Sequence, residues 1–305
     1  MRLTFGPPRR FVPVSTRRRL GYMMDVTYRE CDDESITHII IDERIDMAET
    51  KIEWTDYTFN PWRGCTKIAS GCDNCYAERM ARQNPAVLGE WGPDGKRAWA
   101  AEAYWRLPSK WNEQAAKNGV RRRVFCGSLM DVFEDRPELV VPRIRLFDTI
   151  ASTPDLDWLL LTKRIENVKP ILRAAYELPG GIWEDQQTYW NPLLPNVWLG
   201  ISASNQAEID ASVPILLDMP AAVRFISLEP LLGPVAFPLD SRLNWVIVGG
   251  ESGPHARPMH PDWARSIRDD CQCHDVPFFM KQMGGVRKPF PPIPRDILIQ
   301  EFPQC

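Results

Sequence analysis

The sequence predicts an α/β fold on a parallel sheet, arranged as a partial or complete barrel of six or seven βα units. From Lys51 onward, short apolar runs of β-forming residues alternate with segments of helical period, and no linker interrupts the series. Strands that alternate with helices pair in parallel through right-handed crossovers. The predicted strands are 57–60, 123–126, 158–161, 197–201, 223–227, 245–248 and 278–280. The predicted helices are 73–83, 138–151, 165–175, 206–217 and 261–271.

The bulk composition suits one large domain that does not cross a membrane. The 305 residues are 44% hydrophobic, which is enough for a large core, yet no apolar run reaches eighteen residues. Because the N-terminus lacks the apolar stretch of a secretory signal, we expect a cytoplasmic protein. The net charge of −3 argues against wholesale electrostatic binding to nucleic acid. The densest basic stretch of the body, residues 106–123, is interpreted as a solvated helix face and loop.

Residues 1–46 differ from the rest, with six arginines among the first twenty residues followed by an acidic stretch. We expect a poorly ordered extension there, with Met47 as a natural first residue of the folded part. The barrel domain is predicted over 47–290, followed by a C-terminal tail, 291–305. Two long insertions, 84–105 and 178–195, are rich in Gly, Pro and Trp and are expected to cover the barrel mouth.

Polar residues follow nearly every predicted strand. Because chemistry in parallel barrels takes place at the C-terminal strand ends, this density predicts a lined active-site mouth. The polar strand ends are Gly127-Ser128, Thr162-Lys163-Arg164, Ser202, Ser204-Asn205, Glu229 and Gly249-Gly250-Glu251-Ser252.

Three of the eight cysteines, Cys65, Cys72 and Cys75, lie within eleven residues, between the first strand and a helix. Clustered thiols in a reducing compartment indicate metal or redox chemistry. A structural zinc site requires four ligands, whereas three thiolates can hold a four-iron cluster and leave one iron open. The alternatives are a zinc site completed by a distant residue such as His274, or three cysteines that are close by chance.

The C-x6-C-x2-C loop after the first strand resembles that of the radical S-adenosylmethionine (SAM) superfamily. Over residues 51–285 the chain is similar to an uncharacterised branch of it that is common in phages and prophages. The first cysteine gap is longer than the commonest superfamily spacing, and Asn74 replaces an aromatic residue. The matching blocks are Lys51–Asp56, Asn60–Trp62, Gly71–Glu78, Leu161–Arg164, Ser227–Gly233 and Val248–Pro254.

The resemblance implies a TIM-like barrel of the radical SAM type, acting in a bacterial host cell if phage-encoded. It implies that Cys65, Cys72 and Cys75 bind a [4Fe–4S] cluster and that SAM chelates the open iron. An electron from an external donor would cleave SAM to methionine and a 5′-deoxyadenosyl radical, which takes a hydrogen atom from the substrate.

The resemblance also implies ligands for SAM at the polar strand ends. Each residue by itself has the alternative of a helix cap or a surface salt bridge. The implied contacts are Gly127, Ser128 and Asp131 for the SAM amino group, Lys163 or Arg164 for its carboxylate, Ser202, Ser204 and Asn205 for the ribose, and Glu229 and Glu251 for SAM or substrate.

Three functions stay open at this point. The first is modification or repair of a nucleic acid or nucleotide, because the phage-associated branch resembles DNA-photoproduct lyases in its cysteine loop. The second is the same chemistry on a peptide or small metabolite. The third is a zinc-stabilised binding protein without a redox role.

The remaining thiols and histidines give weaker indications. Cys126 lies in a predicted strand and is expected to be a core thiol. His255 and His260 flank Glu251 and could contact substrate, although such loop side chains are usually solvated. A second metal site is an alternative to unrelated thiols, with Cys271, Cys273, His274 and Cys305 as ligands.

Overall fold

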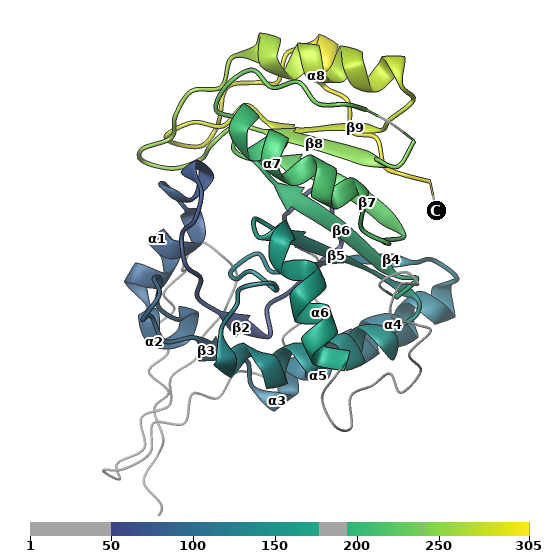
Figure 1. Cartoon of the computed structure of the whole chain (residues 1–305). Coiled ribbons are helices and arrows are strands. Elements are labelled where there is room, and N and C mark those ends of the chain that lie inside the picture. Colours follow the sequence, from purple (N-terminus) through teal and green to yellow (C-terminus); the bar gives the residue numbers. More distant parts are fainter. Residues whose placement is uncertain (1–49, 177–193, 240, 305) are drawn as a thin grey trace, which may run out of the picture. The chain divides into compact units, whose positions relative to one another are not determined.

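The computed structural model describes residues 50–176, 194–239 and 241–304. Its centre is a seven-stranded parallel sheet that adds one strand after another in chain order (Figure 1). Because each crossover continues to the same side, the sheet curls into a half-barrel with β1 and β9 at its edges. The predicted parallel α/β fold is confirmed in the form of a partial barrel. The strands are β1 (Tyr57–Phe59), β4 (Arg122–Cys126), β5 (Leu156–Thr162), β6 (Val197–Ser202), β7 (Val223–Leu228), β8 (Trp245–Gly249) and β9 (Phe278–Gln282).

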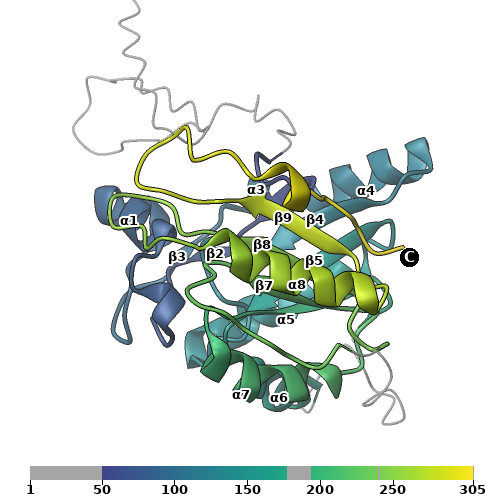
Figure 2. The ribbon, with the colours of Figure 1, turned by 90° about the horizontal axis from the view of Figure 1, so that it is seen from above.

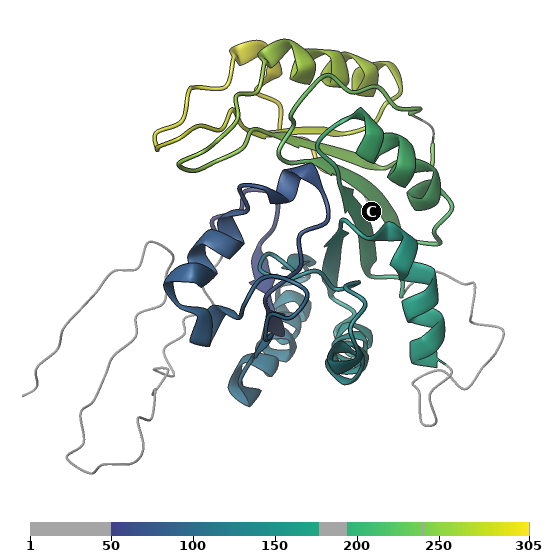
Figure 3. The ribbon, with the colours of Figure 1, turned by 60° about the vertical axis from the view of Figure 1, so that its left-hand side comes forward.

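The helices that connect the strands form an arc outside the curved sheet, from blue through green to yellow-green in Figure 3. Their boundaries follow local signals. Asn205 caps α7 by accepting from the N–H of Glu208 at 3.0 Å. Gly119, with φ of 62°, ends α4 in the left-handed conformation. These helices are α4 (Leu107–Asn118), α5 (Val140–Ala151), α6 (Val168–Tyr176), α7 (Gln206–Leu217) and α8 (Pro261–Cys273).

The predicted helices at 138–151 and 165–175 begin a few residues later than expected. Short 3-10 turns, η2 (Pro137–Leu139) and η3 (Ile165–Asn167), precede α5 and α6. A 3-10 turn is common at the start of an α-helix. The spacing of apolar residues in a 3-10 turn is so close to that in an α-helix that the sequence does not show where one ends and the other begins.

The two faces of the sheet bury different side chains, because successive residues of a strand point to opposite faces. The outer face packs mainly aliphatic residues against the helices, together with Phe59 and Trp158. The inner face is aromatic and centres on Trp245, whose ring lies 6.1 Å from Trp198 and 5.9 Å from Phe225. This aromatic layer fills the concave side of the half-barrel.

The insertion at 84–105 forms a small subdomain beside the first strands. It contains α2 (Pro85–Leu88), α3 (Glu102–Trp105) and β3 (Ala98–Trp99), which pairs with β2 (Trp62–Arg63) in an antiparallel ladder. A buried ion pair of 2.6 Å between Arg97 and Glu134 ties it to the segment after β4.

The final residues pack against the sheet. Ile297 is buried, Gln300 pairs with Phe279 in a bridge, and the ring of Phe302 lies 5.4 Å from Trp245. The extension predicted at 1–46 and all but the last two residues of the insertion at 178–195 lie outside the described residues. Within the described part of the chain, no helix has the length and apolar character to span a membrane.

Candidate functional site

The polar residues predicted at the strand ends gather at one edge of the half-barrel, because the strands are parallel. The cysteine loop (residues 65–75) runs over this edge into α1 (Tyr76–Gln83). It approaches so closely that a Cβ on Gly71 would overlap Oγ of Ser204 and lie 3.3 Å from Nζ of Lys163. Glycine at this position therefore lets the loop backbone lie directly on the ends of β5 and β6.

The three thiols of the loop are partly buried, and none forms a disulfide. Cys72 ends the 3-10 turn η1 (Ser70–Cys72), and Cys75 is the residue before α1. Cys72 and Cys75 are close enough for an electrostatic interaction, whereas Cys65 lies 3.8 Å from a guanidinium nitrogen of Arg164. The loop thus presents two neighbouring thiols at the start of a helix and a third beside a cation.

The surroundings raise the pKa of two of these thiols, Cys65 and Cys75, and so favour their protonated form. Burial, together with the charge of Asp131, raises the pKa of Cys65 to about 12, although Arg164 opposes the shift. Burial also raises the pKa of Cys75, and the N–H groups of Glu78 and Ala77 counteract it without forming regular capping bonds. A bound metal reverses this preference, since thiolates are its ligands.

The donor set fits an iron–sulfur cluster in its chemistry: three unpaired thiols on one short loop, next to a helix N-terminus and a guanidinium that favour negative charge. In the described part of the chain, no three His, Cys, Asp or Glu side chains stand within metal-binding distance of one another. Binding a cluster therefore requires Cys65 and the Cys72–Cys75 pair to approach each other across the loop.

Arg164 holds the first part of the cysteine loop. Its guanidinium donates to Asp131 at 2.9 Å and to the carbonyl oxygen of Thr66 at 2.5 Å. Asp131 also accepts from the hydroxyl of Thr162 and the N–H of Lys163, so its carboxylate is saturated. Burial disfavours the charge on Arg164, but Asp131 and Cys65 outweigh it and raise the pKa of Arg164. The structure thus joins Asp131 and Arg164 in one buried pair.

Lys163 points along the strand ends instead. Its ammonium donates to the hydroxyl of Ser202 at 2.6 Å and to the Ser202 carbonyl at 3.3 Å. Ser204, two residues further on, is completely buried, and its Oγ has no hydrogen-bond partner among the described residues. A buried hydroxyl without a partner costs roughly 1–3 kcal/mol. An amine with donor capacity and an unpaired hydroxyl therefore lie together under Gly71.

The predicted residues on the neighbouring strands are held by other side chains. Glu229 forms an ion pair of 2.6 Å with Lys281. Gly127 begins the turn after β4 with φ of 107°, and the carbonyl oxygen of Ser128 accepts from the hydroxyl of Tyr76 at 2.6 Å. These residues border the mouth beside the loop.

The loop after β8 binds the cysteine loop through Arg257. Its guanidinium donates to Glu251 at 2.5 Å, to Asp73 at 3.2 Å and to the carbonyl oxygen of Ser70 at 2.9 Å. The amide of Asn74 donates to Glu251 at 3.0 Å. Burial opposes ionisation of Glu251, but the bonds from Arg257 and Asn74 outweigh it and lower its pKa.

Glu208 anchors the middle of the cysteine loop to α7. One carboxylate oxygen accepts from the hydroxyl and the N–H of Ser70 at 2.6 and 3.1 Å, and the other accepts from the N–H of Ser204 at 2.8 Å. Burial disfavours the charge on Glu208, but Ser70 and Ser204 outweigh it and lower its pKa.

Sequence reasoning missed Glu208 and Arg257. The pattern Asn205-x-x-Glu208 indicates a helix capping box, which explains Glu208 without the cysteine loop. Arg257 lies in a loop with no periodic signal, and its partners are far away in sequence. Neither residue could be assigned to the loop before the strand order was known.

Of the remaining thiols and histidines, His255 contacts the cysteine loop through its backbone, and the others have different surroundings. Cys126 is fully buried and burial raises its pKa, as expected for a core thiol. Cys271 is buried and Cys273 exposed, so the two point into different surroundings. The carbonyl oxygen of His255 accepts from the Asn74 amide, and His260 caps α8. Cys305 lies outside the described residues.

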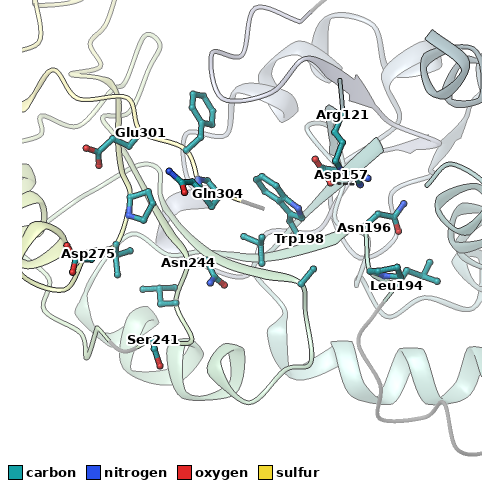
Figure 4. A pocket seen from close by; sticks show the side chains of 18 of the residues that line it. Arg121, Asp157, Leu194, Asn196, Trp198, Ser241, Asn244, Asp275, Glu301 and Gln304 are labelled. Atoms are coloured by element: carbon teal, nitrogen blue, oxygen red, sulfur yellow. Dashed lines mark hydrogen bonds and ion pairs between the residues drawn. The ribbon is translucent and has the colours of Figure 1, made fainter. Parts of the chain in front are cut away.

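A hollow of about 1090 Å³ lies at the opposite end of the half-barrel (Figure 4). It is lined by residues at the N-terminal strand ends, among them Asp157, Asn196 and Asn244, and by Gln304 near the C-terminus. In parallel barrels this end serves stability rather than chemistry. The candidate site is therefore the mouth under the cysteine loop.

The fold and the site together define an α/β half-barrel protein whose cysteine loop covers the C-terminal strand ends. Residues 49–290 match the family model described as "Protein of unknown function (DUF5131)". The chain belongs to this family. No curated protein and no solved structure matches the chain. The assignment to the radical SAM superfamily and its phage branch is therefore wrong, because the model that matches most of the chain is not that of a radical SAM family.

Proposed function

We propose that this protein is an iron–sulfur enzyme in which Cys65, Cys72 and Cys75 bind a [4Fe–4S] cluster, with SAM at the open iron and a nucleic acid or nucleotide as the substrate that is modified or repaired. The observation that carries the proposal is the position of the cysteine loop. Three unpaired thiols lie over the C-terminal strand ends, where TIM-like barrels perform their chemistry.

Three features of the loop support a cluster over structural zinc. Only three thiols belong to the loop, whereas structural zinc requires four ligands. Arg164 and the N-terminus of α1 compensate the negative charge that a thiolate-bound cluster carries. Four side chains anchor the loop: Arg164 at the Thr66 carbonyl, Glu208 and Arg257 at Ser70, and Glu251 at the Asn74 amide.

The side chains at the ends of β5 and β6 favour the binding of a ligand with an anionic group. Lys163 would bind the carboxylate of SAM, and the unpaired hydroxyl of Ser204 would donate to a polar atom of the same ligand. When bound, the cluster would supply one electron from an external donor, and SAM the carbon–sulfur bond whose reductive cleavage gives a 5′-deoxyadenosyl radical. The chain's own residues bind and orient SAM and exclude water, with Gly71 closing the site from above.

The test is anaerobic purification and reconstitution of the full chain, followed by reduction in the presence of SAM. We expect a brown protein with about four irons per chain, and methionine and 5′-deoxyadenosine as products. Stoichiometric zinc with no SAM cleavage would contradict the proposal and favour the zinc-stabilised binding protein. SAM cleavage without any mass change in single-stranded or duplex nucleic acid would retain the cofactor assignment and overturn the substrate class, leaving a peptide or metabolite.

A further inference from the structure

The guanidinium of Arg79 packs directly against the backbone of Gly253, beside the mouth. Arg79 lies on α1, one turn after Cys75, and packs onto Gly253 in the loop after β8. A Cβ on Gly253 would overlap Nη1 of Arg79 and lie 2.8 Å from its Cζ. Gly253 also has φ of 121°, which only glycine adopts readily. The backbone of this loop is therefore shaped to admit the guanidinium.

Arg79 has no hydrogen bond or ion pair from its side chain within the described residues, although it is half-buried. Its neighbours are paired: Arg82 with Glu78 at 2.8 Å, and Arg257 with Glu251. Partial burial of a cation without an anionic partner costs free energy. An anionic ligand that pairs with Arg79 would offset this cost.

Two further cations lie on the same side of the mouth. The N–H of Gly253 donates to the carbonyl oxygen of Gly285 at 3.0 Å, and this contact brings the loop after β9 beside the loop after β8. Arg287 and Lys288 follow two and three residues after Gly285, and both are exposed without an ion pair among the described residues. Figure 2 shows the loop between β8 and α8 beside α1. We call Arg79, Arg287 and Lys288 the basic rim.

An aromatic side chain accompanies the basic rim. Tyr76 lies three residues before Arg79, so both occupy one face of α1. Tyr76 as a whole residue is 38% exposed, while its hydroxyl donates to the carbonyl oxygen of Ser128 at the mouth. Cations that contact phosphates, together with an exposed ring on which a base can stack, are the combination that proteins use for single strands.

The basic stretch 106–123 has fewer unpaired cations available to bind the phosphates of a single strand than its number of basic residues suggests. Arg121 pairs with Asp157 at 2.7 Å, and Arg122 and Arg123 pair with Asp56. Arg121 also lines the hollow at the opposite end of the half-barrel. Half of the charges in that stretch are thus neutralised, and part of it lies far from the cysteine loop.

We infer that the basic rim binds the phosphate backbone of a single-stranded nucleic acid and that a base stacks on Tyr76. The strand then passes beside Cys75 and presents a nucleotide to the mouth. This inference rests on the proposed function for what happens to the nucleotide, whereas strand binding requires neither iron nor SAM.

The test measures fluorescence anisotropy of labelled 20-nucleotide single-stranded DNA, single-stranded RNA and duplex DNA with the full chain. The triple variant R79Q/R287Q/K288Q should bind the preferred single strand at least tenfold more weakly at about 100 mM salt. Its slope of log K against log salt should be smaller by about 2, since each phosphate contact contributes about 0.7 on a single strand. Tyr76→Ala should weaken binding about five- to a hundredfold, and Tyr76→Phe should retain it.

The matched control is R82Q/K110Q/K117Q, which removes the same charge from α1 and α4 and should change affinity less than twofold. The arginines of residues 1–46 are present in every variant and do not affect the comparison. Unchanged binding by the rim variant, equal loss in the control, or equal affinity for a polyglutamate peptide would overturn the inference. Iron content and SAM cleavage, measured on the same variants, show whether the proposed function fails independently of strand binding.

Discussion

Arg257 donates to both carboxylate oxygens of Glu251, at 2.5 and 2.9 Å, and the same guanidinium reaches the cysteine loop at Ser70 and Asp73. The side chain of Glu251 is only 5% exposed. Arg257 therefore links the end of β8 to the cysteine loop, although the two segments are distant in sequence. Because of this link, the geometry of the cysteine loop depends on the position of the loop after β8.

Arg257→Ala should release the cysteine loop. The substitution leaves Glu251 without its main partner and should lower the free energy of unfolding by about 1–3 kcal/mol, since Arg257 is partly exposed. Hydrogen–deuterium exchange of residues 66–76 should accelerate, and iron loading should fall. Arg265→Ala is the control, because Arg265 forms comparable ion pairs with Asp262 and Asp296 away from the loop. Equal acceleration in both variants would contradict the assigned role.

Alanine substitution of Cys65, Cys72 or Cys75 should abolish the bound iron. Each removes one of the three thiolates that are proposed to hold the cluster. Cys273→Ala, on the exposed end of α8, and Cys126→Ala, in the core, should leave the iron unchanged. Iron analysis and the visible absorption spectrum distinguish the outcomes, and full iron in any of the first three variants would disprove that ligand.

Gly71→Ala should lift the cysteine loop from the strand ends. The added methyl group would overlap Oγ of Ser204, an atom of a fully buried residue. We expect reduced iron loading and a lower melting temperature. Gly233→Ala is the control, because no atom lies within 4 Å of its Cβ position. A stable, fully loaded Gly71→Ala protein would show that the loop can dock at a greater distance.

Substitution of Lys163 and of Arg164 should have different effects on SAM binding and on stability. Lys163→Met should weaken SAM binding about ten- to a hundredfold with unchanged iron content, since a charge-assisted hydrogen bond contributes about 1.5–3 kcal/mol. Arg164→Met should instead destabilise the fold by about 3–5 kcal/mol, because it leaves Asp131 buried without its cation. Calorimetric titration with SAM and thermal unfolding separate the effects. A loss of SAM affinity confined to Arg164→Met would reverse the two roles.

Glu208 predicts a pH dependence. Because its pKa is lowered in the folded state, its contribution to stability is fully present above the ordinary pKa of about 4.3 and is lost as the pH falls through the folded value. The difference in melting temperature between the natural chain and Glu208→Gln should therefore narrow from pH 7 to about pH 3.5. A constant difference over this range would show that the charge of Glu208 does not stabilise the loop.

The sequence by itself determined the type of the strands and their positions along the chain. Segments such as 158–161 and 245–248 are continuously apolar and rich in β-formers, and each lies between two helical patterns, so only a parallel sheet accommodates them. The same reasoning placed Ser202, Glu229 and Glu251 at one edge, because parallel strands share the direction of their ends. The resemblance to the radical SAM superfamily rested on short blocks, and these blocks belong to another family.

Only the tertiary structure decided how the site is held together. Local spacing predicted that Cys65, Cys72 and Cys75 form one cluster, but it could not place Glu208 and Arg257 at Ser70. It also could not show that Arg164 forms a buried ion pair with Asp131 while the adjacent Lys163 binds Ser202 instead. Pairing of this kind depends on distances between segments that are 33 to 187 residues apart in sequence. These distances follow from the curl of the sheet, and no periodic pattern in the sequence indicates them.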